Sequence, residues 1–139
     1  MQRLRSIDLK PQQLPLQLLK LSNIQHLWTP IYAHLPANID PFEIMGLLHP
    51  TPAVAGVSTE IACEKIRHYE KFDRSLYAAP LGWVDYEGNC EFIVGIRSAF
   101  IDGDFARVYA GAGIVSGANP NKEFEEVQLK MQSLLKTLV

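Results

Sequence analysis

Three charged side chains near the C-terminus have the types and the spacing of a small ionic site. Glu123, Glu126 and Lys130 are spaced i, i+3 and i+7, so at about 100° per residue they share one narrow sector of a helix. Two carboxylates and one ammonium could hold a divalent metal and an acidic ligand together. The alternative is an ordinary solvated helix, with acids near its start and lysines near its end to suit the helix dipole.

The same helix has an apolar stripe beside this sector, which indicates that the ionic site lies at the margin of a buried surface. Glu125 points away from both the stripe and the site. The stripe is formed by Phe124, Val127, Met131, Leu134, Leu135 and Leu138.

Arg97 is a second candidate, because it lies within the apolar segment 90–101. We predict a strand there, with Arg97 deep in it and on the same face as Ile93 and Gly95. An unpaired guanidinium in such a place is costly, so Arg97 is expected to have an anionic partner. That partner is either a structural carboxylate or the carboxylate of a ligand, which the planar fork grips with two hydrogen bonds.

A glycine-broken turn follows the next predicted strand. Gly111 and Gly113 alternate with alanines after Tyr109. Glycine allows another group to approach the main chain closely, because no side chain shields the N–H groups. The backbone near Gly111 is therefore a third candidate for contact with a ligand.

The elements that must position these residues belong to an α+β domain with an antiparallel sheet. The period of two and the turn residues favour a meander of three strands. The strands are expected at residues 77–86, 90–101 and 105–115, with turns at 87–89 and 102–104.

Helices and shorter strands complete the prediction. Asp40-Pro41 and Asn119-Pro120 each combine a capping side chain with proline at the first helical position. Segment 49–56 contains two prolines and then small residues, so we expect neither helix nor central strand but a rigid loop, which would suit a pocket wall. Helices are expected at 15–21, 41–48, 60–71 and from 120 onward, and short strands at 23–29 and 31–35.

Length and composition set broad limits. The chain has 139 residues, 47% of them hydrophobic and 20% charged, and a net charge of −2; this is material for one globular domain and does not suggest nucleic-acid binding. No apolar run reaches the roughly 18 residues of a membrane helix. The start lacks the apolar core of a signal peptide, and Cys63 and Cys90 form neither a disulfide framework nor a metal-ligand pattern. A reducing cytoplasm is therefore expected.

Several motifs together resemble the chorismate-utilising enzymes, and within them the isochorismate synthases of quinone (menaquinone, phylloquinone) and siderophore pathways. The likeness covers residues 23–139, after a loop-rich lead-in at 1–22. The motifs, in order, are His49-Pro-Thr-Pro-Ala-Val, Phe72-Asp-Arg, Tyr77-Ala, Leu81-Gly-Trp, Ile96-Arg-Ser-Ala, Tyr109-Ala-Gly-Ala-Gly-Ile-Val and Glu123-Phe-Glu-Glu.

The resemblance implies both a fold and a function. Family enzymes are much longer and form an α/β/β/α sandwich, of which this chain would be the C-terminal portion. The implied reaction is Mg²⁺-dependent conversion of chorismate to isochorismate. The family's general-base lysine and general-acid glutamate lie in the part that precedes this segment, so the chain by itself is expected to be inactive, with that N-terminal portion as its partner. Neither nucleic acid nor a membrane is expected as a partner.

The resemblance also implies roles for particular residues. Glu126 would bind Mg²⁺ directly, and Glu123 directly or through water. Arg97, Lys130 and the N–H near Gly111 would hold substrate carboxylates, while His26 would lie near the reacting ring. The pocket wall would be formed by Tyr77, Tyr109, Ile96, Ala53 and Val54.

Two alternatives remain at this point. The chain could be a non-catalytic fragment or relic that binds a partner or ligand without turnover. Within the family it could instead belong to an anthranilate, aminodeoxychorismate or salicylate synthase. The His49-Pro-Thr-Pro-Ala-Val segment and its Ala53 are closest to the isochorismate synthases.

Overall fold

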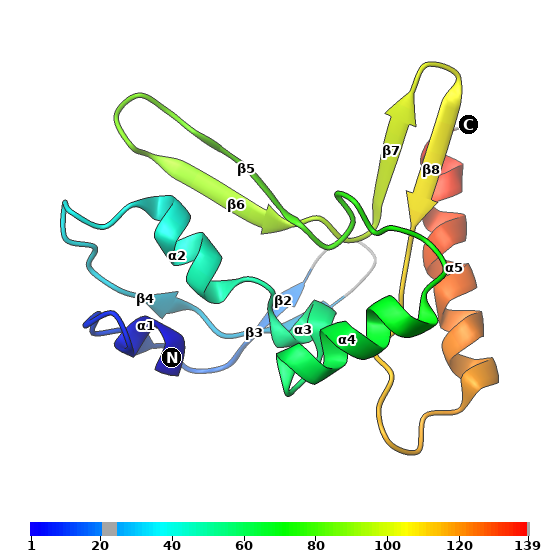
Figure 1. The fold of residues 1–139 in the computed structure, drawn as a ribbon, viewed down its shortest axis with the longest axis horizontal. Helices are drawn as coiled ribbons and strands as arrows, with labels where there is room; N and C mark the ends of the chain where they lie inside the picture. Colours follow the sequence, from blue (N-terminus) through cyan, green and yellow to red (C-terminus); the bar gives the residue numbers. More distant parts are fainter. Residues whose placement is uncertain (21–24, 139) are drawn as a thin grey trace. The chain divides into compact units, whose positions relative to one another are not determined.

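The computed structural model describes residues 1–20 and 25–138. It divides into two compact units, Met1–Leu48 and His49–Val139. Both combine helices with two-stranded antiparallel sheets (Figure 1). The boundary expected between residues 22 and 23 lies outside the described residues.

The first unit contains two short antiparallel sheets and two helices. Strand β2 pairs with β3, and β1 pairs with β4. The Asp40-Pro41 cap is confirmed, since the N–H of Phe42 donates to Asp40 Oδ1 at 2.8 Å. The elements are α1 (Gln2–Arg5), β1 (Gln12–Gln13), β2 (Gln17–Lys20), β3 (Gln25–Trp28), β4 (Ile31–Tyr32) and α2 (Pro41–Leu48).

The prediction of a helix at 15–21 is wrong, because residues 17–20 form strand β2. Their partner is β3, in a register that sets Gln17 opposite Trp28. Pairing with a later segment therefore overrides the local pattern of this short stretch. The strand expected at 23–29 is confirmed at Gln25–Trp28, and residues 23 and 24 lie outside the described residues.

The second unit contains helices α3 (Pro52–Ala55), α4 (Thr59–Tyr69) and α5 (Pro120–Leu138). The cap of α5 is confirmed, since Asn119 Oδ1 accepts hydrogen bonds from the N–H groups of Asn121 at 3.0 Å and Lys122 at 3.3 Å. The expectation of no helix at 49–56 is wrong. Pro52 takes the first helical position of α3, where no N–H is required, and the turn stops at Gly56 with φ 76°.

The strands of the second unit form two separate hairpins, not the expected three-stranded meander. β5 (Pro80–Val84) pairs with β6 (Cys90–Val94), and β7 (Ser98–Asp102) pairs with β8 (Phe105–Tyr109). The segment expected as one strand at 90–101 is interrupted at residues 95–97, where Arg97 has φ 49°. A left-handed residue ends the extended conformation, so the alternation of faces does not continue through it.

The segment before β5 is also not the strand that the pattern predicts. Tyr77 and Ala78 lie in a turn, and Ala78 has φ 63°. Two hydrogen bonds connect this turn to the break between β6 and β7: Ala78 N–H to the carbonyl of Gly95, and Gly95 N–H to the carbonyl of Ala79, both 2.8 Å. Tyr77 is thereby placed next to the hairpins without belonging to either.

Few hydrophobic side chains are buried among the described residues. Phe105 is 82% exposed and Ile114 is 75% exposed. Burial of such side chains would contribute about 1.5–3 kcal/mol each, so these surfaces favour contact with further protein. The buried hydrophobic residues are Leu4, Leu9, Ala55, Ala78 and Tyr109.

The turn of the β5–β6 hairpin yields a prediction about pH. Asp85 Oδ1 accepts hydrogen bonds from the N–H groups of Glu87 at 2.9 Å and Asn89 at 2.8 Å, and Oδ2 accepts from Asn89 Nδ2 at 2.9 Å. These hydrogen bonds hold the pKa of Asp85 below its ordinary value of 3.8, and the bond from the Asn89 side chain contributes most. The ionised carboxylate therefore stabilises the turn above that value, and the stabilisation disappears as the pH falls through the lower folded-state pKa.

We expect the protection of the Glu87 and Asn89 amides from hydrogen exchange to fall in that acidic range. The measurement is the amide exchange rate at each pH, corrected for the intrinsic effect of pH on exchange. Asp85→Asn is the control, because its amide oxygen can still accept the two backbone hydrogen bonds but does not titrate. The same acid transition in the variant would show that Asp85 does not cause it.

Candidate functional site

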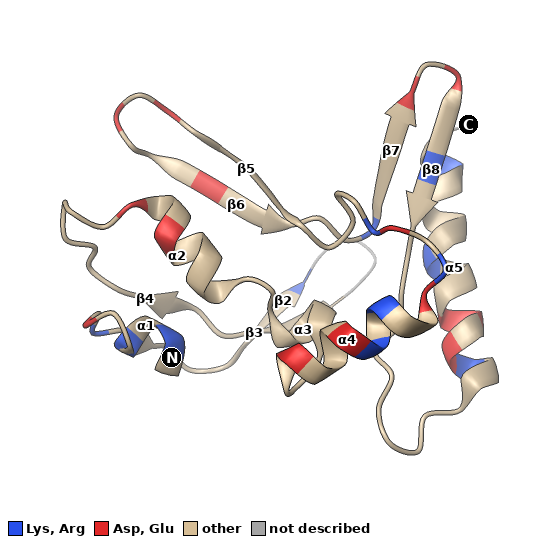
Figure 2. Cartoon of the chain, viewed as in Figure 1, with Lys and Arg blue, Asp and Glu red and all other residues tan. Residues whose placement is uncertain are grey.

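Helix α5 brings Lys130 to the glycine-broken turn after β8. Lys130 Nζ donates to the carbonyl of Gly111 at 2.9 Å and forms an ion pair with the carboxylate of Glu126 one turn earlier. The side chain of Lys130 is 23% exposed and that of Glu126 is 54% exposed. Figure 2 shows the acidic residues of α5 near its beginning. The predicted proximity of Glu126, Lys130 and Gly111 is therefore present in the structure, although Lys130 contacts the carbonyl of Gly111.

Two tyrosines lie near Gly111. The rings of Tyr77 and Tyr109 are stacked, with centroids 5.1 Å apart and an interplanar angle of 9°. A Cβ atom at Gly111 would lie 2.7 Å from the hydroxyl oxygen of Tyr77, so any larger residue here would have to displace that hydroxyl. Tyr77, Tyr109, Gly111, Lys130 and Glu126 thus form one continuous set of contacts, which we call the tyrosine–lysine cluster.

The phenol of Tyr77 is a protonated group at neutral pH. Burial raises the pKa of Tyr77, and the positive charge of Arg74 lowers it by a smaller amount. A neutral phenol can both donate and accept a hydrogen bond. Tyr77 therefore offers a neutral hydroxyl close to Gly111.

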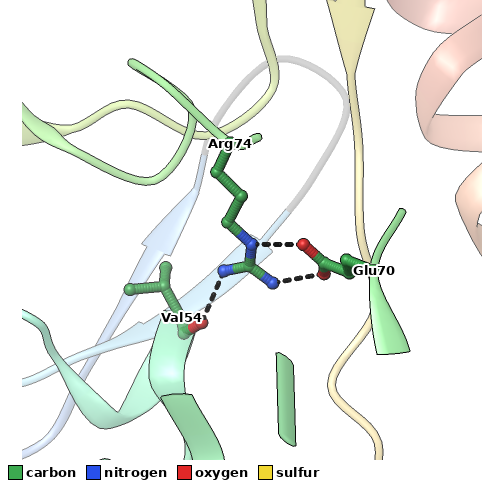
Figure 3. Close-up of polar contacts among 3 residues, drawn as sticks. All are labelled: Val54, Glu70 and Arg74. Atoms are coloured by element: carbon green, nitrogen blue, oxygen red, sulfur yellow. Dashed lines mark hydrogen bonds and ion pairs between the residues drawn. The ribbon is translucent and has the colours of Figure 1, made fainter. Parts of the chain in front are cut away.

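Arg74 is a residue of this region that sequence reasoning assigned no role. Its Nε and Nη2 atoms donate to the two carboxylate oxygens of Glu70 at 2.7 and 2.6 Å, and its Nη1 donates to the carbonyl of Val54 at 3.2 Å (Figure 3). Its guanidinium carbon lies 5.6 Å from the centroid of the Tyr77 ring. The hydrogen bond with Glu70 is the main cause of the raised pKa of Arg74. The Phe72-Asp-Arg motif was the available signal for this residue.

A cleft of about 260 Å³ opens beside Arg74 and Tyr77. Val54 lines it, as expected for a pocket wall, whereas Ala53, Ile96 and Tyr109 are not among its lining residues. The cleft is lined by His49, Pro50, Val54, Ala55, Cys63, Ile66, Arg67, Arg74, Ser75, Tyr77, Ala78 and Ala79.

Three other predicted site residues, Arg97, Ile96 and His26, are not part of the tyrosine–lysine cluster. Arg97 is exposed at the break between β6 and β7, so the expectation that it lies deep in a strand is wrong. Among the described residues it has no carboxylate partner. Ile96 beside it is 48% exposed. His26 lies on β3 of the first unit, opposite Leu19.

The donor set for a metal is partial. No group of three or more His, Cys, Asp or Glu side chains suited to a metal occurs in the described part of the chain. Glu123 is half-buried in the first turn of α5, and Glu126 follows it by three residues. Mg²⁺ in proteins typically takes one or two carboxylates and completes its shell with waters and substrate oxygens. The two glutamates therefore fit such a site, in which the metal would compete with Lys130 for Glu126.

Comparisons with known proteins identify relatives. The family model described as chorismate binding enzyme matches residues 1–139. The isochorismate synthase MenF of Bacillus subtilis is 44% identical over 121 residues, which are 87% of this chain and 26% of the relative. Isochorismate synthase 2, chloroplastic, of Arabidopsis thaliana is 46% identical over 120 residues, 86% of this chain and 21% of the relative.

A solved structure agrees with the fold. The structure from Bacillus anthracis described as a 2,3-dihydroxybenzoate-specific isochorismate synthase, DhbC, matches with a TM-score of 0.88 at 35% identity, over 99% of this chain and 37% of that one. This match confirms the predicted α+β class and the predicted resemblance. The chain spans between about a fifth and about two fifths of these three proteins.

Within residues 1–20 and 25–138, no helix is both long enough and apolar enough to cross a bilayer.

Proposed function

The chain belongs to the family of chorismate binding enzymes, and from this premise we propose that it supplies the C-terminal part of an isochorismate synthase. The assembled enzyme is this chain together with the portion of the domain that the relatives carry outside the matched segment. Its reaction would be the conversion of chorismate to isochorismate with Mg²⁺. A cytoplasmic location stays a prediction.

The tyrosine–lysine cluster is the observation that supports this proposal. Chorismate has two carboxylates and a ring. The ammonium of Lys130 is held near the Gly111 backbone and can bind a carboxylate. The partly exposed ring of Tyr77, supported by the buried ring of Tyr109 stacked on it, can form a wall for a ligand ring. An ammonium, glycine N–H groups and a guanidinium together form a suitable receptor for a dianion.

Glu123 and Glu126 would hold Mg²⁺. When bound, the metal would anchor a substrate carboxylate and neutralise its charge. Lys130 already pairs with Glu126, so on substrate binding its ammonium could move from that carboxylate to one of the substrate. The role of this chain is thus to bind and orient, and we assign the general base and the general acid to the rest of the assembled enzyme.

The exposed hydrophobic side chains support the proposal that the rest of the enzyme packs against this chain. Phe105 on β8 and Ile114 after it present apolar surface to solvent, and the relatives have most of their length outside the matched segment. We assign these surfaces to contact with that further portion of the domain.

A substitution at Arg97 tests whether this residue binds a substrate carboxylate. We expect Arg97→Lys to weaken chorismate binding to the assembled enzyme by roughly 1.5–3 kcal/mol, because a charge-assisted hydrogen bond and the bidentate geometry are lost. Its exposure and the lack of a carboxylate partner among the described residues leave the guanidinium available to a ligand. Calorimetric titration with chorismate measures the effect. Arg107→Lys on β8 is the matched control, and equal affinities for the Arg97 variant and the wild type would remove Arg97 from the receptor.

A further inference from the structure

Arg74 connects parts of the second unit that are distant in sequence. Val54 lies at the end of α3, Glu70 follows the last residue of α4, and Tyr77 precedes β5. One guanidinium contacts all three, by a hydrogen bond to the Val54 carbonyl, two to the Glu70 carboxylate, and its position near the Tyr77 ring. Its side chain is 26% exposed and that of Glu70 is 29% exposed.

These contacts use the shape of the guanidinium, not only its charge. Three different nitrogen atoms donate, to three different oxygen atoms (Figure 3). A planar fork can satisfy a carboxylate with two parallel bonds and still direct a third donor elsewhere. A lysine ammonium is a compact point charge and cannot reproduce this arrangement.

The two segments that Arg74 holds are short, and the second is also held by backbone hydrogen bonds between Ala78–Ala79 and Gly95. Helix α3 is a single turn whose N-cap, Thr51, makes no side-chain cap hydrogen bond, and Arg74 supplies a donor to one of its terminal carbonyls. The turn that carries Tyr77 has non-glycine residues with positive φ at Ser75 (50°) and Ala78 (63°). Such conformations cost of order 1–2 kcal/mol each and persist only where the surroundings impose them.

We propose that Arg74 is a positioning residue of the substrate site: clamped by Glu70, it fixes the Val54 wall and the Tyr77 ring against which the substrate packs. This inference rests on the proposed function, since it assigns a purpose to the wall. Arg74 acts through Val54 and Tyr77 and not by contact with the substrate. Loss of the clamp loosens these two segments and leaves the helices α4 and α5 in place.

Two measurements on the assembled enzyme test the proposal, namely amide hydrogen exchange and calorimetric titration with chorismate. The variants are Arg74→Lys, Arg74→Gln and Glu70→Gln. The matched control is Arg107→Lys, because Arg107 is exposed on β8, does not line the cleft, and the substitution is the same. Exchange is compared between the amides of Gly56 and Ala78, in the two held segments, and that of Met131, in the middle of α5.

We expect all three variants to exchange faster at Gly56 and Ala78, with Met131 unchanged. They should bind chorismate roughly tenfold more weakly, because binding must then order the two loosened segments. Arg74→Lys should not restore either property, whereas the Arg107 control should resemble the wild type. If Arg74→Gln does not fold, Glu70→Gln decides, because it leaves the arginine in place.

The outcomes separate this inference from the proposed function. Uniformly faster exchange, at Met131 as much as at Gly56, would mean that Arg74 only stabilises the fold and would overturn the proposal. Full rescue by Arg74→Lys would overturn it too, since charge alone would then suffice. A wild type that does not bind chorismate would contradict the proposed function, and the exchange pattern would still decide whether Arg74 positions Val54 and Tyr77.

Discussion

Residues 1–139 purified alone are expected to form no detectable isochorismate from chorismate, even with excess Mg²⁺. The chain contributes the tyrosine–lysine cluster and two carboxylates for the metal, and we assign the general base and the general acid to the rest of the assembled enzyme. General acid–base catalysis typically contributes about 10²–10⁴-fold for each group, so the loss of both puts the rate below measurement. The partial donor set on α5 lowers it further.

A coupled assay that detects isochorismate measures this expectation. The same chain with Glu126→Gln is the control for contaminating activity, because a contaminant does not respond to a substitution in this chain. Isochorismate formed by the wild type at a rate that the substitution reduces would contradict the expectation. A base would then have to exist within these residues.

Glu126→Gln is expected to have the second large effect, in the assembled enzyme. Neutralising a carboxylate ligand weakens the attraction for a hard cation. Losses of supporting groups around metals already cost about 10–100-fold, so the Mg²⁺ concentration for half-maximal activity should rise at least about tenfold. The substitution also removes the ion-pair partner of Lys130, which frees the ammonium but leaves it less well held.

Glu125→Gln is the matched control for that experiment, since Glu125 is exposed on the same turn of α5 and makes no ion pair among the described residues. Titration of activity against Mg²⁺ compares the two variants. Equal shifts would show that overall charge, and not coordination by Glu126, determines the response to the metal.

The helices that begin with local signals could be predicted from the sequence. Asn119 and Asp40 accept the hydrogen bonds expected of capping residues, because such bonds depend only on residues within the same turn. The turns of both hairpins were predictable for the same reason, with Gly88 at φ 85° and Gly103 at φ 55°. Each of these features is determined within a few residues.

The break in the segment 90–101 could not be predicted from alternation. Apolar residues continue on both sides of Arg97, and nothing in their order indicates a left-handed residue. The break is set by hydrogen bonds between Gly95 and the turn at Ala78–Ala79, which joins positions distant in sequence. Pairing of this kind also explains why residues 17–20 form a strand and not a helix.

The candidate site was predictable where it lies on one helix, and not where it depends on contacts between segments. The spacing of Glu126 and Lys130 brings them together on α5. Arg74 was missed because its contact with Val54 spans 20 residues and Glu70 precedes it outside a helix. The roles of all the predicted site residues, Glu126 and Lys130 included, stay predictions.

The central claim is that this chain provides the carboxylate- and metal-binding part of an isochorismate synthase, and a chimera tests it most directly. The matched segment of MenF from Bacillus subtilis, 44% identical over 121 residues, is replaced by this chain, and isochorismate formation is measured in the folded chimera. We expect Mg²⁺-dependent turnover whose Mg²⁺ requirement is raised by Glu126→Gln and left unchanged by Glu125→Gln. A chimera that folds with the thermal stability of MenF but forms no isochorismate, or whose Mg²⁺ requirement is unaffected by Glu126→Gln, would contradict the account.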